Sequence, residues 1–125
     1  MKKLYYLLAL GLCIMLKGCG WYTSSVDDIN DVLLMFPKTF EMSTFSSGKL
    51  DKTVIISEND KLYKESYDLL NKNRGDWVVD INSYAPDVLL SSEFLNMNLM
   101  DTIVVINYTL DKGETWRQKS FKMNY

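Results

Sequence analysis

The side chains that could do chemistry in this chain are serines, lysines and carboxylates, because its 125 residues include no histidine. Without histidine, the commonest general base, a serine nucleophile would need a lysine beside it. Such a spacing occurs in Ser46-Ser47-Gly48-Lys49, but the composition of this segment is that of a turn. Turn formation therefore explains this spacing better than catalysis does.

Paired carboxylates are the other route to acid–base chemistry, as in glycoside hydrolysis. Asp76, Asp80 and Asp87 lie close together in the sequence. Asp76 precedes an expected strand and Asp87 follows Pro86 in an expected loop, and these positions are typical of solvated or turn-forming aspartates. The sequence also lacks a glycine-rich phosphate loop. We therefore expect a protein that is not an enzyme and that binds neither a cofactor nor a metal ion.

The composition is that of one globular domain, with 47% hydrophobic and 24% charged residues. The net charge is −2, and removing residues 1–18 with their three lysines leaves 11 basic and 16 acidic residues, or −5. An acidic body without a lysine and arginine cluster is a poor partner for nucleic acid, whose binding depends on neutralised phosphates. The same charge argues against an electrostatic grip on anionic lipid.

The first 20 residues have the pattern of an export signal. Lys2 and Lys3 are followed by an apolar stretch over residues 4–16, interrupted only by Gly11. As a helix this stretch would span roughly 20 Å, less than the hydrocarbon core of a bilayer. A short positive segment, an apolar segment and a small-residue exit together predict a secretory signal peptide.

The exit of this segment, Leu16-Lys17-Gly18-Cys19, resembles the lipobox of bacterial lipoproteins, although Lys17 stands where a small or apolar residue is usual. The resemblance implies that the signal peptide (residues 1–18) is removed and that Cys19 receives a diacylglycerol. Gly20 lacks the aspartate-type signal for inner-membrane retention, which implies an outer-membrane anchor facing the periplasm where the cell has an outer membrane. The alternatives are an ordinary signal peptide, cleaved before Trp21, and an uncleaved anchor.

Behind an expected tether (19–25), one α+β domain is expected over residues 26–125. Ser24 and Asp27 indicate the start of a short helix that ends before Pro37. Ser57 and Asp60 form a second capping-box pattern before a long amphipathic helix over 61–73, with Gly75 as its stop. Since Cys13 leaves with the signal peptide, the domain can form no internal disulfide.

The remaining segments alternate or are rich in β-branched residues, which predicts strands. These segments are 39–45, 52–57, 77–82, 88–90, 93–99, 102–110 and 115–123, with Asp111-Lys112-Gly113-Glu114 as a hairpin connection. We expect an antiparallel sheet of about four to six strands with the main helix packed on one face. A cystatin-like arrangement fits this order at the level of topology only, which is no argument for function.

Exposed aromatic residues among polar ones favour a protein interface, and Tyr84, Tyr108 and Trp116 are the candidate partner-binding residues. The alternative is that these side chains cover the sheet as cross-strand pairs. The sequence thus favours a non-enzymatic binding lipoprotein, such as an immunity or inhibitor protein against an envelope-acting toxin or hydrolase. Other candidates are a pilotin-like accessory or assembly factor of a secretion or surface machine, and a small-ligand carrier or hydrolase whose site is not recognisable. The partner's identity and the oligomeric state are left open.

The lipobox resemblance gives the first prediction. Mass spectrometry of the mature N-terminus should find a diacylglyceryl group on Cys19. Cys19→Ser removes the sulfur that forms the thioether, so this variant should leave the membrane fraction. A mature protein that begins at Trp21 would contradict the assignment.

Overall fold

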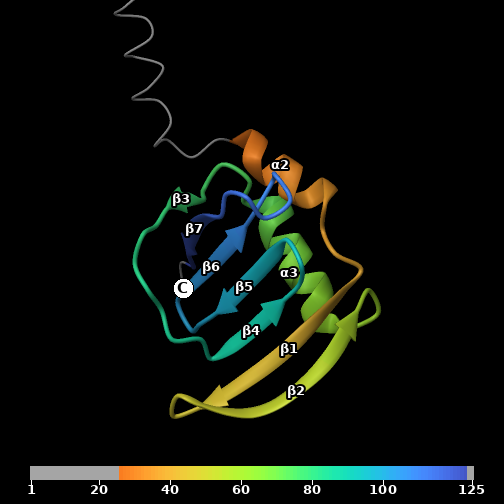
Figure 1. Cartoon of the computed structure of the whole chain (residues 1–125), viewed down its shortest axis with the longest axis vertical. Helices are drawn as coiled ribbons and strands as arrows, with labels where there is room; N and C mark the ends of the chain where they lie inside the picture. The colour runs from red at the N-terminus through yellow and green to blue at the C-terminus, as the bar shows by residue number, and fades with distance from the viewer. Residues whose placement is uncertain (1–25, 124–125) are drawn as a thin grey trace, which may run out of the picture.

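A computed structural model describes residues 26–123, which form two helices and seven strands (Figure 1). The helices are α2 (Val26–Leu34) and α3 (Lys61–Lys72), and the strands are β1 (Thr39–Ser46), β2 (Lys49–Ser57), β3 (Val78–Val79), β4 (Val88–Ser91), β5 (Leu95–Leu99), β6 (Ile103–Tyr108) and β7 (Arg117–Lys122). The expected signal peptide, the tether with Cys19 and the helix cap Ser24 lie outside the described residues.

The seven strands form one antiparallel sheet in the order β2-β1-β4-β5-β6-β7-β3. The expected α+β class, with a main helix and a short N-terminal one, is confirmed. The sheet is larger than the expected four to six strands, because every short strand segment joins it. The strands that flank α3 in the sequence, β2 and β3, lie at opposite edges of this sheet.

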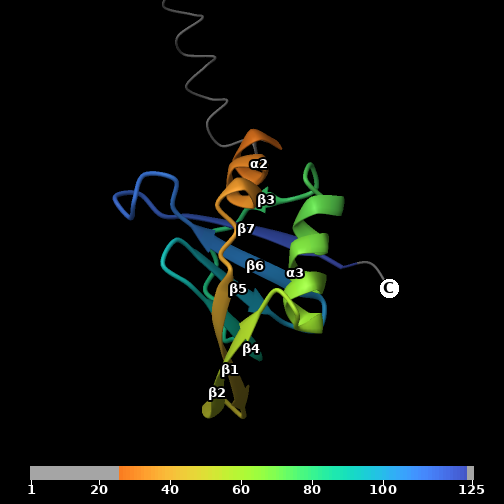
Figure 2. The same ribbon diagram turned by 90° about the vertical axis from the view of Figure 1, so that its right-hand side faces the viewer.

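Helix α3 packs on one face of the sheet, as Figure 2 shows from the side. Its apolar spacing places Leu70 in the core with no exposed surface. On the sheet, Leu90 pairs with Met97 and Met97 with Ile106, and all three side chains are fully buried. This row of cross-strand neighbours forms the centre of the core with Leu70.

An aromatic cluster fixes the path from α2 to β1. The ring of Phe36 meets Phe40 and Tyr63 edge to face, with centroids 5.4 and 5.2 Å apart. The Tyr63 hydroxyl donates to the carbonyl of Pro37 at 2.5 Å. Because Pro37 cannot continue a helix, the chain leaves α2 here and is held against α3 as it enters the sheet.

The β1–β2 hairpin turns at Ser47 and Gly48, with φ angles of 53° and 77°. Positive φ at both central residues gives a turn whose twist matches that of the flanking strands. The expected turn at residues 46–49 is therefore confirmed. Beyond it the register shifts between Thr44 and Phe45, which leaves Asp51 of β2 as a bulged residue.

The expected strand over 77–82 is correct for Val78 and Val79 only. Trp77 is fully buried, but Ile81, expected on the same face, is 93% exposed. The cause is an Asx turn, in which the Asp80 carboxylate accepts a hydrogen bond from the backbone N–H of Asn82 at 2.8 Å. This turn leads the chain out of the strand after a short pairing with β7.

The second capping box is shifted by one turn relative to the expectation. The Asp60 carboxylate accepts a hydrogen bond from the backbone N–H of Ser57 at 2.8 Å, as the pattern predicts. Asp60 itself, rather than Ser57, is the N-cap of α3. The bond therefore closes the turn between β2 and α3 instead of capping the helix.

The core analysis predicts unequal costs for two leucines on helices. Leu70→Ala removes a fully buried side chain and should lower the free energy of unfolding by about 3 kcal/mol. Leu34→Ala is the matched control, since Leu34 is 86% exposed on α2 and should change stability by less than ~0.5 kcal/mol. Urea unfolding followed by circular dichroism measures both, and equal losses would contradict this account of the core.

Candidate functional site

A cluster of polar side chains lies where α2 meets β6 and β7. It consists of Asp28, Tyr108, Arg117 and Lys119, and is called the Asp28 cluster below. The Asp28 Oδ2 atom accepts hydrogen bonds from the Tyr108 hydroxyl at 2.7 Å and from Arg117 Nη1 at 2.8 Å. Lys119 Nζ lies 3.7 Å from the same oxygen. Tyr108 and Arg117 are directly paired across the sheet, so one carboxylate joins the helix to both strands.

The environment of the cluster shifts the pKa values of its members. Burial alone would raise the pKa of Asp28, but the hydrogen bonds from Tyr108 and Arg117 and the positive charges of Lys119 and Arg117 lower it overall. Burial lowers the pKa of Lys119, whose side chain is 3% exposed, and outweighs the attraction of Asp28. Burial and the bond to Asp28 raise the pKa of Tyr108. Asp28 therefore stays ionised and offsets the buried ammonium group.

This arrangement is suited to structure more than to catalysis. Two hydrogen bonds and an ion pair with Lys119 converge on one carboxylate oxygen, which leaves the acid engaged and not free to act as a base. The described residues also contain no group of three or more acidic, cysteine or histidine side chains placed to hold a metal ion. The Asp28 cluster therefore positions α2 on the sheet.

The structure separates the three aromatic residues expected to bind a partner. Tyr108 is fully buried, so the expectation that it contacts a partner directly is wrong, because its hydroxyl is bound to Asp28. Tyr84 is half-buried, and its hydroxyl donates to the Asp80 carboxylate at 2.6 Å. Trp116 is 44% exposed at the end of the β6–β7 connection. Of the three, Trp116 offers the most accessible surface.

The three aspartates considered for acid–base chemistry lie in surroundings typical of surface and turn residues. Asp76 and Asp87 are exposed. Both oxygens of Asp80 accept hydrogen bonds, from the backbone of Asn82 and from the Tyr84 hydroxyl, and the Tyr84 bond contributes most to its lowered pKa. These contacts organise the chain between β3 and β4, which agrees with the turn-forming role expected from the sequence.

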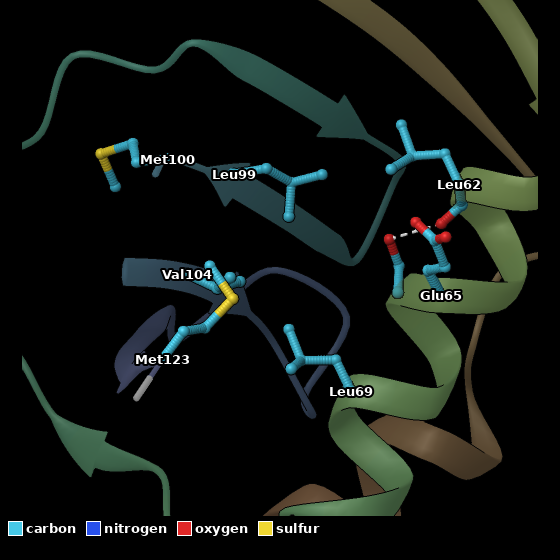
Figure 3. Close-up of a pocket in the computed structure, with 8 residues that line it drawn as sticks. Leu62, Glu65, Leu69, Leu99, Met100, Val104 and Met123 are labelled. Atoms are coloured by element: carbon cyan, nitrogen blue, oxygen red, sulfur yellow. Dashed lines mark hydrogen bonds between the residues drawn. The ribbon is translucent and has the colours of Figure 1, made fainter. Parts of the chain in front are cut away.

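An apolar pocket of about 220 Å³ lies between α3 and the ends of β5 and β6 (Figure 3). It is lined by Leu62, Glu65, Ser66, Leu69, Leu99, Met100, Val104 and Met123. The Ser66 hydroxyl is already bound to the carbonyl of Leu62 at 2.8 Å, so it offers little to a ligand. The pocket is also smaller than the ~300–1,000 Å³ usual for ligand sites.

The outer edge of β2 is a candidate binding surface that the sequence did not predict. This nine-residue strand pairs with β1 alone within the described part of the chain. Leu50, Val54 and Ile55 are 62%, 39% and 66% exposed along it. The β-branched run Thr53-Val54-Ile55-Ile56 indicated a strand but not its place at the sheet edge, since edge position depends on pairings distant in sequence.

Comparisons with known proteins find none that is similar to this chain. A scan against protein-family models, a search of curated proteins and a search of solved structures each return no match to this chain. Between residues 26 and 123, the structure contains no helix with the length and apolar character needed to cross a membrane.

The Asp28 cluster predicts a pH-dependent contribution to stability. Asp28→Asn should lower the free energy of unfolding at pH 7 by about 2 kcal/mol, because Arg117 and Lys119 lose their counterion. Since folding lowers the pKa of Asp28, its stabilisation is fully present above the usual value of 3.8 and is lost as the pH falls through the folded-state value.

Asp31→Asn on the same helix is the matched control, because Asp31 is exposed. Thermal unfolding between pH 2 and pH 7 gives the melting temperature of each protein. The difference in melting temperature between wild type and Asp28→Asn should narrow below about pH 4, and Asp31→Asn should melt close to wild type throughout. A melting-temperature difference that stays constant over this pH range would contradict the stabilising role of the ionised Asp28 carboxylate.

Proposed function

We propose that this protein is a membrane-tethered, non-enzymatic binding lipoprotein that faces the periplasm and holds a protein partner. The tether in this proposal is the lipid on Cys19, since two or three acyl chains hold a protein stably at a membrane. The observation that most supports binding is the open outer edge of β2 with its exposed aliphatic side chains.

An edge strand presents backbone N–H and C=O groups that can pair with an added strand. Natural proteins protect such edges with charges and bulges, and β2 has both near its turn, at Lys49, Lys52 and the bulged Asp51. Residues 53–55 follow without such protection, and Val54 and Ile55 are exposed there. We infer that the partner adds an extended segment to this part of β2, where main-chain hydrogen bonds give affinity and alternate side chains give specificity.

The most concrete form of the proposal is an immunity or inhibitor protein that blocks an envelope-acting toxin or hydrolase. A pilotin-like accessory or assembly role uses the same surface and differs only in the partner. The cystatin-like likeness, a helix on an antiparallel sheet, belongs to this proposal as architecture and gives no function by itself. The apolar pocket of about 220 Å³ beside α3 is the feature that bears on the second candidate, a small-ligand carrier, and its lining suits an aliphatic group.

A lysine placed on β2 tests the proposed surface. Ile55→Lys adds a charge to the exposed edge, which opposes strand addition, while the 66% exposure of Ile55 leaves the fold intact. In affinity purification of the lipidated protein from envelope extract, one partner should be recovered near stoichiometrically with wild type and at least tenfold less with Ile55→Lys. Val78→Lys is the matched control on the opposite edge, where Val78 is 57% exposed, and should bind as wild type.

Two results would overturn the proposal. One is equal recovery of the partner by all three proteins, which would remove the β2 edge as the contact surface. The other is reproducible turnover of a peptidoglycan, ester or glycoside substrate that a single carboxylate substitution abolishes, which would replace binding by catalysis.

A further inference from the structure

The position of α2 determines where the proposed lipid anchor meets the folded domain. Cys19 lies seven residues before Val26, which begins α2. Even fully extended, seven residues span at most about 25 Å. If Cys19 is lipidated as proposed above, the end of the domain that holds α2 therefore stays close to the membrane.

Trp116 is held at this same end. Arg117, the next residue, donates to the carboxylate of Asp28 on α2 at 2.8 Å. Figures 1 and 2 both place the β6–β7 connection near α2, and the turn of the β1–β2 hairpin at the opposite end of the domain. Trp116 thus lies at the end of the domain where α2 begins.

The connection that ends at Trp116 is organised by its own hydrogen bonds. The Asp111 carboxylate accepts bonds from the Thr109 hydroxyl and from the backbone N–H of Thr115, each at 2.8 Å. The backbone N–H of Gly113 donates to the Thr109 hydroxyl at 2.9 Å. These bonds present Trp116 on a defined loop, so little conformational freedom is lost when its indole contacts another surface.

A second exposed apolar residue, Ile81, lies in a segment that is bound to the start of β7. Ile81 is 93% exposed, the highest value among the large apolar residues described. Its neighbours on both sides are bound to β7, since Asp80 N–H donates to the carbonyl of Gln118 at 3.2 Å and the Gln118 side chain donates to the carbonyl of Asn82 at 2.7 Å. The backbone of Ile81 is therefore held next to the first residues of β7, which directly follow Trp116 in the chain.

We propose that Trp116 and Ile81 form a membrane-contact site, which places the α2 end of the domain on the lipid surface that holds the anchor. This inference rests on the proposed lipid anchor. Indole side chains favour the headgroup region of a bilayer, where the ring is half-buried and its N–H stays hydrated. The connection carries Lys112 against Asp111 and Glu114, and Arg117 is already paired with Asp28, so the site has no excess positive charge and needs no anionic lipid.

The test uses full-length, natively lipidated protein reconstituted in phosphatidylcholine vesicles that contain brominated phosphatidylcholine. Bromine quenches tryptophan that lies in the bilayer interface, and Trp21→Phe removes the tryptophan of the tether from the signal. The remaining Trp77 is fully buried and serves as an unquenched reference. We expect brominated lipid to quench at least a third of the emission, and to quench almost none of it in the double variant Trp21→Phe/Trp116→Phe.

A second variant controls for misfolding. Ile81→Asn, at a position that is 93% exposed, should keep the circular dichroism of the parent and reduce the quenching at least twofold. Vesicle-bound protein whose Trp116 emission is not quenched would overturn the contact site while leaving the lipid anchor intact, and would leave this surface to a protein partner. Protein that does not associate with the vesicles at all would overturn the anchor, and the contact site with it.

Discussion

The carboxylate of Asp28 is the contact on which the placement of α2 depends. It binds Tyr108 and Arg117 on two neighbouring strands at 2.7 and 2.8 Å, and it balances the buried ammonium group of Lys119. Apolar packing of Ile29 and Val32 attaches the same helix to the core but fixes its direction less specifically. The direction of α2 in turn determines where the preceding chain leaves the domain. A single ionised group thus links the fold to the proposed anchor.

Burying Lys119 in a small domain is costly, because an ammonium group loses its hydration. The pairing of β6 with β7 explains why Lys119 is buried. Lys119 pairs with the fully buried Ile106, so the Lys119 side chain lies on the helix-facing side of the sheet. An apolar residue there would pack equally well but would leave the acid of α2 with weaker partners. We infer that the charge specifies how the helix docks more than it adds stability.

The local elements were predictable from the sequence, since their signals lie within a few residues. The Ser47-Gly48 turn, the apolar face of α3 around Leu70 and the β-branched run of β6 all form where expected. The failures depend on partners far along the chain. Tyr108 was named among three candidate partner-binding residues without a decision on which of them faces outward, because nothing near it in sequence reveals the acid 80 residues earlier that binds its hydroxyl. The exposure of Ile55 likewise follows from the absence of a second neighbour for β2 among the described strands, which no local pattern encodes.

The two edges of the sheet are unequal, since β2 has nine residues and β3 only two. A sheet with two long open edges can recruit copies on both sides and grow into a fibre, because each added chain exposes a new site. Here a strand added to β2 ends the growth, as the far edge offers too few backbone groups to hold another. Among the described strands, this inequality therefore favours pairs over open-ended growth in any assembly that proceeds through the sheet edges.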